Sequence, residues 1–280
     1  MNIYKTTSSK FIFLLIVSIL TSALLAYAII VSSEKLNVFT VIIFLINAYV
    51  LVSLFLEYKN IQEQRIENLI KFAEVRGYDF VKKPSDIQIT EFKDFKAMSK
   101  SLLPYGMHSF MNLFTPKISI ADGNNEKPSI VTISTTISAG ESSSTYYTQV
   151  YKFKLKSEIP IFYLAGGHHF SFSNLFRNKN IFKGIKELKE IDIQKFNFPK
   201  NKYKLYSSDE TIKDFFTKEF INLLNTGLRK KKETLYIESN GKEVIFYTLY
   251  KRHTLQGMDF FINLFIVLIK SLNINIEAHH

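Results

Sequence analysis

Two long apolar runs open the chain. Residues 11–31 and 36–56 contain 21 residues each and no Asp, Glu, Lys or Arg, and only four residues separate them. About 20 helical residues cross the roughly 30 Å hydrocarbon core of a bilayer. The pattern therefore predicts a transmembrane helical hairpin within residues 1–59, followed by a domain over residues 60–280.

The positions of the cations predict the orientation of this hairpin. Lys and Arg near the ends of membrane spans are enriched on the cytoplasmic side. A single cation, Lys35, lies between the two runs, whereas several flank their outer ends: Lys5 and Lys10 before the first run, and Lys59, Arg65, Lys71 and Arg76 after the second. We therefore expect a multi-pass protein with both termini in the cytoplasm.

Two alternatives for the apolar runs are less consistent with the sequence. Ala26-Tyr27-Ala28 resembles the cleavage site of a signal peptide, but the first run is longer than a usual signal-peptide core and continues to Val31. A buried helical pair in a soluble protein would carry a polar face, which both runs nearly lack. The membrane hairpin is the better prediction.

The polar residues inside the runs favour an anchor over a transporter. Ser18, Ser22 and Ala26 in the first run would allow close helix packing, within one chain or in a homo-oligomer. The second run contains Asn47 but no ionisable side chain, whereas ion and proton paths normally contain one. A homo-oligomer that lines a pore with Asn47 stays open as an alternative.

The rest of the chain mixes helical and strand patterns. A helix is expected over residues 57–77, and β-branched, alternating runs predict a β-hairpin from 130–137 and 146–155. Further strands are expected at 159–165 and 203–206. Residues 234–238 and 242–250 form a second predicted hairpin, because Asn240-Gly241 between them is typical of tight turns.

Two more helices complete the predicted domain. Ser207 and Glu210 fit a capping box that starts a helix ending near Gly227. A final helix over residues 258–272 is too short to span a bilayer comfortably and is expected to be buried in the core. The predicted fold class is α+β: an N-terminal transmembrane hairpin followed by a cytoplasmic domain of antiparallel β-hairpins packed with helices.

The charge balance narrows the classes of partner. The chain has a formal net charge of +11, which favours anionic lipid headgroups or a small anionic ligand as partners, beside the lipid bilayer itself. Of its 36 basic residues only five are Arg, so bidentate recognition of nucleic acid is unlikely. The chain has no Cys, and no motif indicates a metal or another cofactor.

Alternating lysines form the most regular candidate for a binding surface. They lie on one side of two predicted strands, opposite apolar and aromatic residues, and would present a cationic face if the strands were neighbours: Lys152, Lys154 and Lys156, and Lys200, Lys202 and Lys204. Solvated lysines that protect a sheet edge are the alternative explanation.

One histidine pair is the second candidate site. Gly166-Gly167-His168-His169 places two imidazoles after a flexible backbone, as in some ligand sites. Adjacent side chains in an extended segment point to opposite faces, and no ligand spacing supports a metal site. His108 and His253 are isolated from any recognisable catalytic motif.

Several of these segments together resemble a group of uncharacterised bacterial membrane proteins, which have an N-terminal two-helix transmembrane hairpin and a cytoplasmic domain of unknown function. The similar segments are the helix ending at Gly77, the strands around Tyr146-Tyr147-Thr148-Gln149-Val150 and Ile159-Pro160-Ile161-Phe162, and residues 203–216. The resemblance extends over about residues 60–272. It implies the bacterial inner membrane and no reaction or catalytic residue.

These observations lead to one principal functional hypothesis and two alternatives. The principal hypothesis is a non-enzymatic, membrane-anchored module that binds or senses a ligand in the cytoplasm. The first alternative is a membrane-perturbing effector gated by ligand binding to the domain. The second is a hydrolase or transferase that uses His168 or His169.

Overall fold

The computed structural model describes residues 9–31, 38–93, 95, 106–117, 127–139, 142–155, 157–166, 188–193, 203–229, 235–248 and 253–278. The chain forms two compact units. The first comprises Met1–Phe72 and Thr254–Gln256, and the second comprises Ala73–His253 and Gly257–His280. Within the described residues the fold is α+β, with six helices and one sheet of nine strands.

Two helices make up most of the first unit. They are α1 (Ser9–Val31) and α2 (Val38–Arg76), and they contain the two apolar runs of the sequence. The side-chain amide of Asn47 in α2 donates a hydrogen bond of 3.0 Å to the hydroxyl of Ser22 in α1. This bond joins the helices at a point where both are otherwise apolar.

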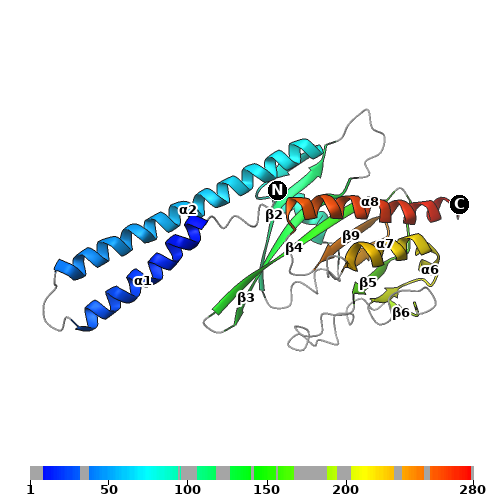
Figure 1. Ribbon diagram of the computed structural model, residues 1–280. Helices are drawn as coiled ribbons and strands as arrows, with labels where there is room; N and C mark the ends of the chain where they lie inside the picture. The colour runs from blue at the N-terminus through cyan, green and yellow to red at the C-terminus, as the bar shows by residue number, and fades with distance from the viewer. Residues whose placement is uncertain are drawn as a thin grey trace. The chain divides into compact units, whose positions relative to one another are not determined.

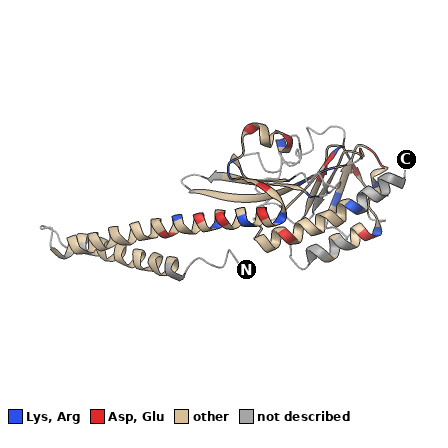
Figure 2. Ribbon diagram, turned by 90° about the horizontal axis from the view of Figure 1, so that it is seen from above, with Lys and Arg blue, Asp and Glu red and all other residues tan. Residues whose placement is uncertain are grey.

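Helix α2 changes character along its length. Its first part carries apolar residues, whereas charged residues begin at Glu57 and continue to Arg76 (Figure 2). Among the described helices, Thr40–Arg76 is long and apolar enough to cross a membrane, and α1 contributes the shorter apolar stretch Phe11–Tyr27. The helix ends as predicted, because Gly77 has a φ of 67°, the left-handed conformation typical of glycine after a helix.

The second unit is built on the nine-stranded sheet (Figure 1). All described strand pairs are antiparallel. In spatial order the strands are β1 (Tyr78–Val81), β2 (Gly106–Pro116), β3 (Ser129–Ala139), β4 (Ser142–Lys154), β9 (Glu243–Thr248), β8 (Tyr236–Ser239), β5 (Phe162–Gly166), β7 (Tyr203–Ser207) and β6 (Lys189–Ile191).

Both predicted hairpins are confirmed. Strands β3 and β4 pair along their length, from Ser129 opposite Lys152 to Ala139 opposite Ser142. Strands β8 and β9 are joined at Asn240-Gly241, where Gly241 has a φ of 105° and the Asn240 side-chain oxygen accepts hydrogen bonds from two backbone amides. The turn chemistry of the sequence therefore sets the register of this hairpin.

Helices cover both faces of the sheet. On one face, α8 (Leu255–Ala278) packs Phe265 on Phe246 with a centroid distance of 4.5 Å, which confirms the prediction of a buried C-terminal helix. On the other face, α3 (Asp86–Lys93) places Phe92 in a core cluster with Val150 and Ile245. Each sheet face thus has its own apolar core.

The prediction of one helix that starts at Ser207 is wrong, because the helical segment starts later and is divided into two helices. Ser207 ends β7, and its hydroxyl donates a hydrogen bond to the Ile161 carbonyl at 2.9 Å instead of capping a helix. Two helices follow, α6 (Ile212–Phe215) and α7 (Lys218–Arg229). Phe216 interrupts them with non-helical φ and ψ of −89° and 85°, and Phe216 is buried.

The N-cap of α7 gives a first prediction. The Thr217 hydroxyl accepts a hydrogen bond of 3.0 Å from the Phe220 amide, so we expect Thr217→Ala to lower the free energy of unfolding by about 1 kcal/mol. Thr211→Ala is the control, because the Thr211 side chain makes no capping bond to α6. Thermal unfolding of both variants checks this, and an equal loss in both would contradict the capping role.

Candidate functional site

A buried lysine lies at the centre of the candidate site. Lys152 is in β4, opposite Ser129 of β3 and Ile245 of β9. The predicted alternation places it on the opposite face from Tyr151 and Phe153. That face is covered rather than solvated, however, and the Lys152 side chain is only 1% exposed. Lys152 is therefore not part of the molecular surface.

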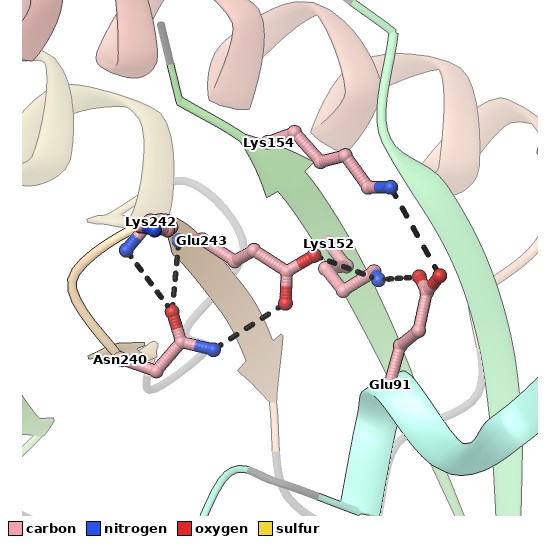
Figure 3. Close-up of polar contacts among 6 residues, drawn as sticks. All are labelled: Glu91, Lys152, Lys154, Asn240, Lys242 and Glu243. Atoms are coloured by element: carbon pink, nitrogen blue, oxygen red, sulfur yellow. Dashed lines mark hydrogen bonds and ion pairs between the residues drawn. The ribbon is translucent and has the colours of Figure 1, made fainter. Parts of the chain in front are cut away.

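Two carboxylates hold the Lys152 ammonium (Figure 3). It donates hydrogen bonds to Glu91 Oε2 and to Glu243 Oε1, the latter at 3.1 Å. Lys154, two residues further along β4, lies with its Nζ 3.9 Å from Glu91 Oε1. The four side chains, two cationic and two anionic, therefore balance in charge, and the buried Lys152 ammonium is compensated by its carboxylate partners.

The two carboxylates are held differently. Glu243 lies at the start of β9, is 17% exposed, and accepts a hydrogen bond of 3.3 Å from the Asn240 side-chain amide in the adjoining turn (Figure 3). Glu91 belongs to α3 and is 53% exposed. Glu243 is thus fixed within the sheet, whereas Glu91 is brought in by a separate element.

Helix α3 is short but internally well defined. The Ser85 backbone amide donates to the Gln88 side-chain oxygen at 2.9 Å, as in a capping box, and the Ser85 hydroxyl donates to the same oxygen at 3.2 Å. The Lys93 ammonium at the end of the helix lies 3.1 Å from the Asp86 carboxylate at its start. Phe92 is 1% exposed, and the Lys152 ammonium lies 5.2 Å from the centroid of its ring.

The charges of the cluster lower the pKa of Glu91. Its hydrogen bond from Lys152 is the largest cause, and the charges of Lys152 and Lys154 add to it, while partial burial acts in the opposite direction. A carboxyl group with a pKa below its ordinary value of 4.5 stabilises the fold above that value. This stabilisation disappears as the pH falls through the folded-state pKa.

This linkage gives a second prediction. At pH 7 we expect Glu91→Gln to lower the melting temperature by a few degrees, because the neutral side chain attracts Lys152 and Lys154 less strongly. The difference from the unsubstituted chain should shrink as the pH falls through the lowered pKa of Glu91, because Glu91 itself then becomes neutral. Glu243 also faces the cluster but is present in both proteins. A difference independent of pH would contradict the assignment.

Among the other predicted lysines, Lys204 is described by the structure and is not part of this cluster. Lys204 lies in β7 and pairs with Glu190 of β6 at 3.2 Å. Strands β4 and β7 are not neighbours, because β9, β8 and β5 lie between them, a separation of about 19 Å. Lys152 and Lys204, the described members of the two lysine sets on these strands together with Lys154, therefore do not lie on adjacent strands. Lys156, Lys200, Lys202, His168 and His169 lie outside the described residues, and their ligand binding stays a prediction.

A row of stacked tyrosines lies on the same sheet face as Lys152. Tyr247, Tyr236, Tyr163 and Tyr206 come from four consecutive strands, with centroid distances of 5.4, 6.4 and 6.4 Å between successive rings. Burial raises the pKa of Tyr163 far above its ordinary value and keeps its hydroxyl neutral. No sequence pattern predicts this row, because it depends on the spatial order of the strands.

His253 belongs to a buried polar network on the opposite face. Its Nδ1 lies 2.8 Å from the Tyr151 hydroxyl and its Nε2 lies 3.0 Å from the Thr248 hydroxyl. Its backbone amide donates to Gln149 at 3.0 Å, and its ring stacks on Phe261 at 4.1 Å. Because both ring nitrogens have hydroxyl partners, this histidine fixes packing between β4, β9 and α8.

Metal binding finds no support in the described part of the chain. No group of three or more His, Asp or Glu residues within it is arranged to hold a metal ion. The Nδ1 atom of His108 lies 3.1 Å from the Thr135 hydroxyl, and burial lowers the pKa of His108. The cluster around Lys152 is accordingly the site that the described residues define best.

Comparison with known proteins identifies one similar solved structure and no family. No protein-family model matches the chain, and no curated protein matches it. The crystal structure of the mycobacterial trehalose monomycolate transport factor A, TtfA, is similar with a TM-score of 0.41 and 11% sequence identity, over 72% of this chain and 93% of that chain.

Proposed function

We propose that the protein is a membrane-anchored, non-enzymatic module that binds a ligand or partner. In this proposal α1 and the first part of α2 cross the bacterial inner membrane as a hairpin, with both termini in the cytoplasm. The sheet domain then lies at the cytoplasmic face. The observation that carries the proposal is the continuity of α2 from its apolar part to its charged part.

Exposed apolar side chains support the membrane assignment. Large residues on α1 and the first part of α2 are more than half exposed, among them Phe13, Leu45, Tyr49 and Phe55. Extended apolar surface of this kind marks a site of contact with a membrane or a protein. A membrane is favoured because both runs have the length of a bilayer span.

The polar groups of the two helices agree with a membrane environment. Asn47 and Ser22 bond to each other between the helices, as polar side chains do in membrane helix pairs. The Thr21 hydroxyl donates to the Val17 carbonyl at 2.9 Å, one helical turn away. The amide nitrogen of Asn47 and the hydroxyls of Ser22 and Thr21 thereby find partners in the protein, as hydrocarbon surroundings favour.

The second part of α2 has the properties of a helix in water. Four acidic and four basic residues lie between positions 57 and 76, and Lys59 and Glu63 pair one turn apart at 3.8 Å. Such a surface is stable only outside the hydrocarbon core. We infer that α2 leaves the bilayer near Glu57 and leads directly into the domain.

Binding is favoured over catalysis by the state of the charged groups. The ammonium groups of Lys152 and Lys154 compensate the carboxylates of Glu91 and Glu243. Catalytic sites more often hold acids, bases or nucleophiles in strongly perturbed states. In an ion pair between neighbouring elements, an anionic ligand can replace the carboxylate as the partner of the ammonium group. Such pairs are therefore better suited to binding than to catalysis.

Membrane fractionation tests the anchor. Bacteria expressing the full chain should retain it in the membrane pellet after washing with alkaline carbonate, and a detergent should release it. A variant lacking residues 9–56 should move to the soluble fraction. Recovery of the full chain in the soluble fraction would contradict the proposal.

A further inference from the structure

We propose that Glu91 of α3 occupies an anion-binding site formed by Lys152 and Lys154, and that an amphiphilic anion displaces α3 from it. The ligand class is a carboxylate or phosphate attached to an aryl or alkyl group. The inference rests on the proposed binding function and specifies its site, its ligand chemistry and its closed state.

Two ammonium groups converge on the Glu91 carboxylate. Lys152 donates to Oε2, and Lys154 Nζ lies 3.9 Å from Oε1, so each oxygen of the carboxylate faces a different cation. A ligand carboxylate or phosphate presents oxygens at similar spacing and would form the same charge-assisted contacts. Glu91 thus stands where the anionic group of a ligand would bind.

The lysine site does not depend on α3 for its own stability. Without Glu91, Lys152 keeps the Glu243 carboxylate at 3.1 Å, and Asn240 holds that carboxylate in place. No buried charge is then left uncompensated, which would be the costly outcome. Lys152, Lys154 and Glu243 together retain a net charge of +1, which attracts an anion.

Helix α3 is the element best suited to move. Its capping box and its Lys93–Asp86 pair lie within residues 85–93, so the helix can keep these contacts when it separates from the sheet. Its two buried side chains are Ile89 and Phe92. The Glu91 carboxylate is half exposed, so a ligand anion can approach it from solvent.

The ring of Phe92 defines the second requirement on the ligand. It lies next to the Lys152 ammonium and packs in the cluster that contains Val150, Ile245 and Tyr247. Separation of α3 would expose this apolar surface to water at a considerable cost. Inorganic phosphate cannot offset that cost, whereas an anion with an adjoining apolar group replaces both Glu91 and Phe92.

The test uses the full chain in phosphatidylcholine nanodiscs and three probes: phenyl phosphate, inorganic phosphate and benzyl alcohol. We expect calorimetry to show binding of phenyl phosphate at least about tenfold tighter to Glu91→Gln than to the unsubstituted chain, because the competing carboxylate is gone. The other two probes should bind much more weakly. Phenyl phosphate should also speed hydrogen exchange of the α3 amides.

Two further variants serve as controls. Glu190→Gln removes a carboxylate from an ion pair on the same sheet face, with exposed Lys204, and should leave phenyl phosphate affinity unchanged. Lys154→Ala should weaken the binding of phenyl phosphate severalfold, both in the unsubstituted chain and in the Glu91→Gln variant. Because the Lys154 side chain is exposed, this substitution should not prevent folding. Equal affinities in the unsubstituted, Glu91→Gln and Glu190→Gln proteins, or unchanged exchange in α3, would overturn the inference.

Failure of this inference is separable from failure of the anchor. If the protein stays in the membrane after carbonate washing but Glu91→Gln leaves its affinity for phenyl phosphate unchanged, the α3 displacement alone is refuted. A soluble protein that still shows the tenfold difference would refute the anchor alone.

Discussion

Replacing Lys152 with Met is expected to lower the free energy of unfolding by about 3 kcal/mol. The change removes the cation that separates Glu91 from Glu243, so a largely buried carboxylate loses its partner and faces a second carboxylate. For a domain of this size the melting temperature should fall by about 6–12 °C. Thermal unfolding of the full chain in detergent micelles measures the effect.

Lys154→Met is the matched control for this prediction. Lys154 lies on the same strand and the same face, but its side chain is 73% exposed, and an ion pair at such a position contributes about 1 kcal/mol or less. A similar loss of stability in both variants would mean that Lys152 is not specifically held by the two carboxylates.

The second large effect concerns the apolar part of α2. Replacing both Leu45 and Val52 with Arg should move most of the protein out of the carbonate-resistant membrane fraction. Each Arg near the centre of a span costs about 2.5–3.5 kcal/mol of insertion free energy. Both side chains are exposed in α2 and lie two turns apart, so neither substitution disturbs a buried contact.

The control places the same two charges in the other part of the helix. Gln64→Arg with Val75→Arg alters two exposed positions beyond Glu57 and should leave membrane association unchanged. Loss of membrane association in the control, or its retention in the Leu45 and Val52 variant, would show that the apolar part of α2 does not lie in the bilayer.

Local sequence signals predicted the elements whose partners are close in the chain. The β3–β4 and β8–β9 hairpins follow from alternation and from the turn chemistry of Asn240-Gly241. The burial of α8 follows from its apolar run, although the helix extends beyond the predicted 258–272. In each case a short-range preference and the packing of the sheet agree.

Long-range packing explains what the sequence did not reveal. Alternation places Lys152 on one strand face, but its partners Glu91 and Glu243 lie 61 and 91 residues away in the chain. No spacing rule links positions that only the order of the strands brings together. The same applies to the separation of β4 from β7 and to the hydroxyl partners of His253.

The sequence pattern predicts no clear element between Tyr78 and Pro116, where the structure has β1, α3 and β2, and the reason is local. Within strand β2, Asn112 adopts a φ of 53° and its backbone amide donates a hydrogen bond to the Lys82 carbonyl at 3.0 Å. The pairing register with β3 shifts at the same place. A bulge of this kind interrupts the alternation that identifies a strand, and α3 is too short to show a clear helical period.

Cysteine labelling of intact cells tests the central claim, the membrane hairpin with its domain in the cytoplasm, most directly. The chain contains no Cys, so Glu34→Cys and Gln64→Cys each provide a single site. In bacterial spheroplasts, a membrane-impermeant maleimide should label Cys at position 34 at once, and Cys at position 64 only after permeabilisation. Labelling of position 64 in intact spheroplasts, or of neither position until permeabilisation, would contradict the account.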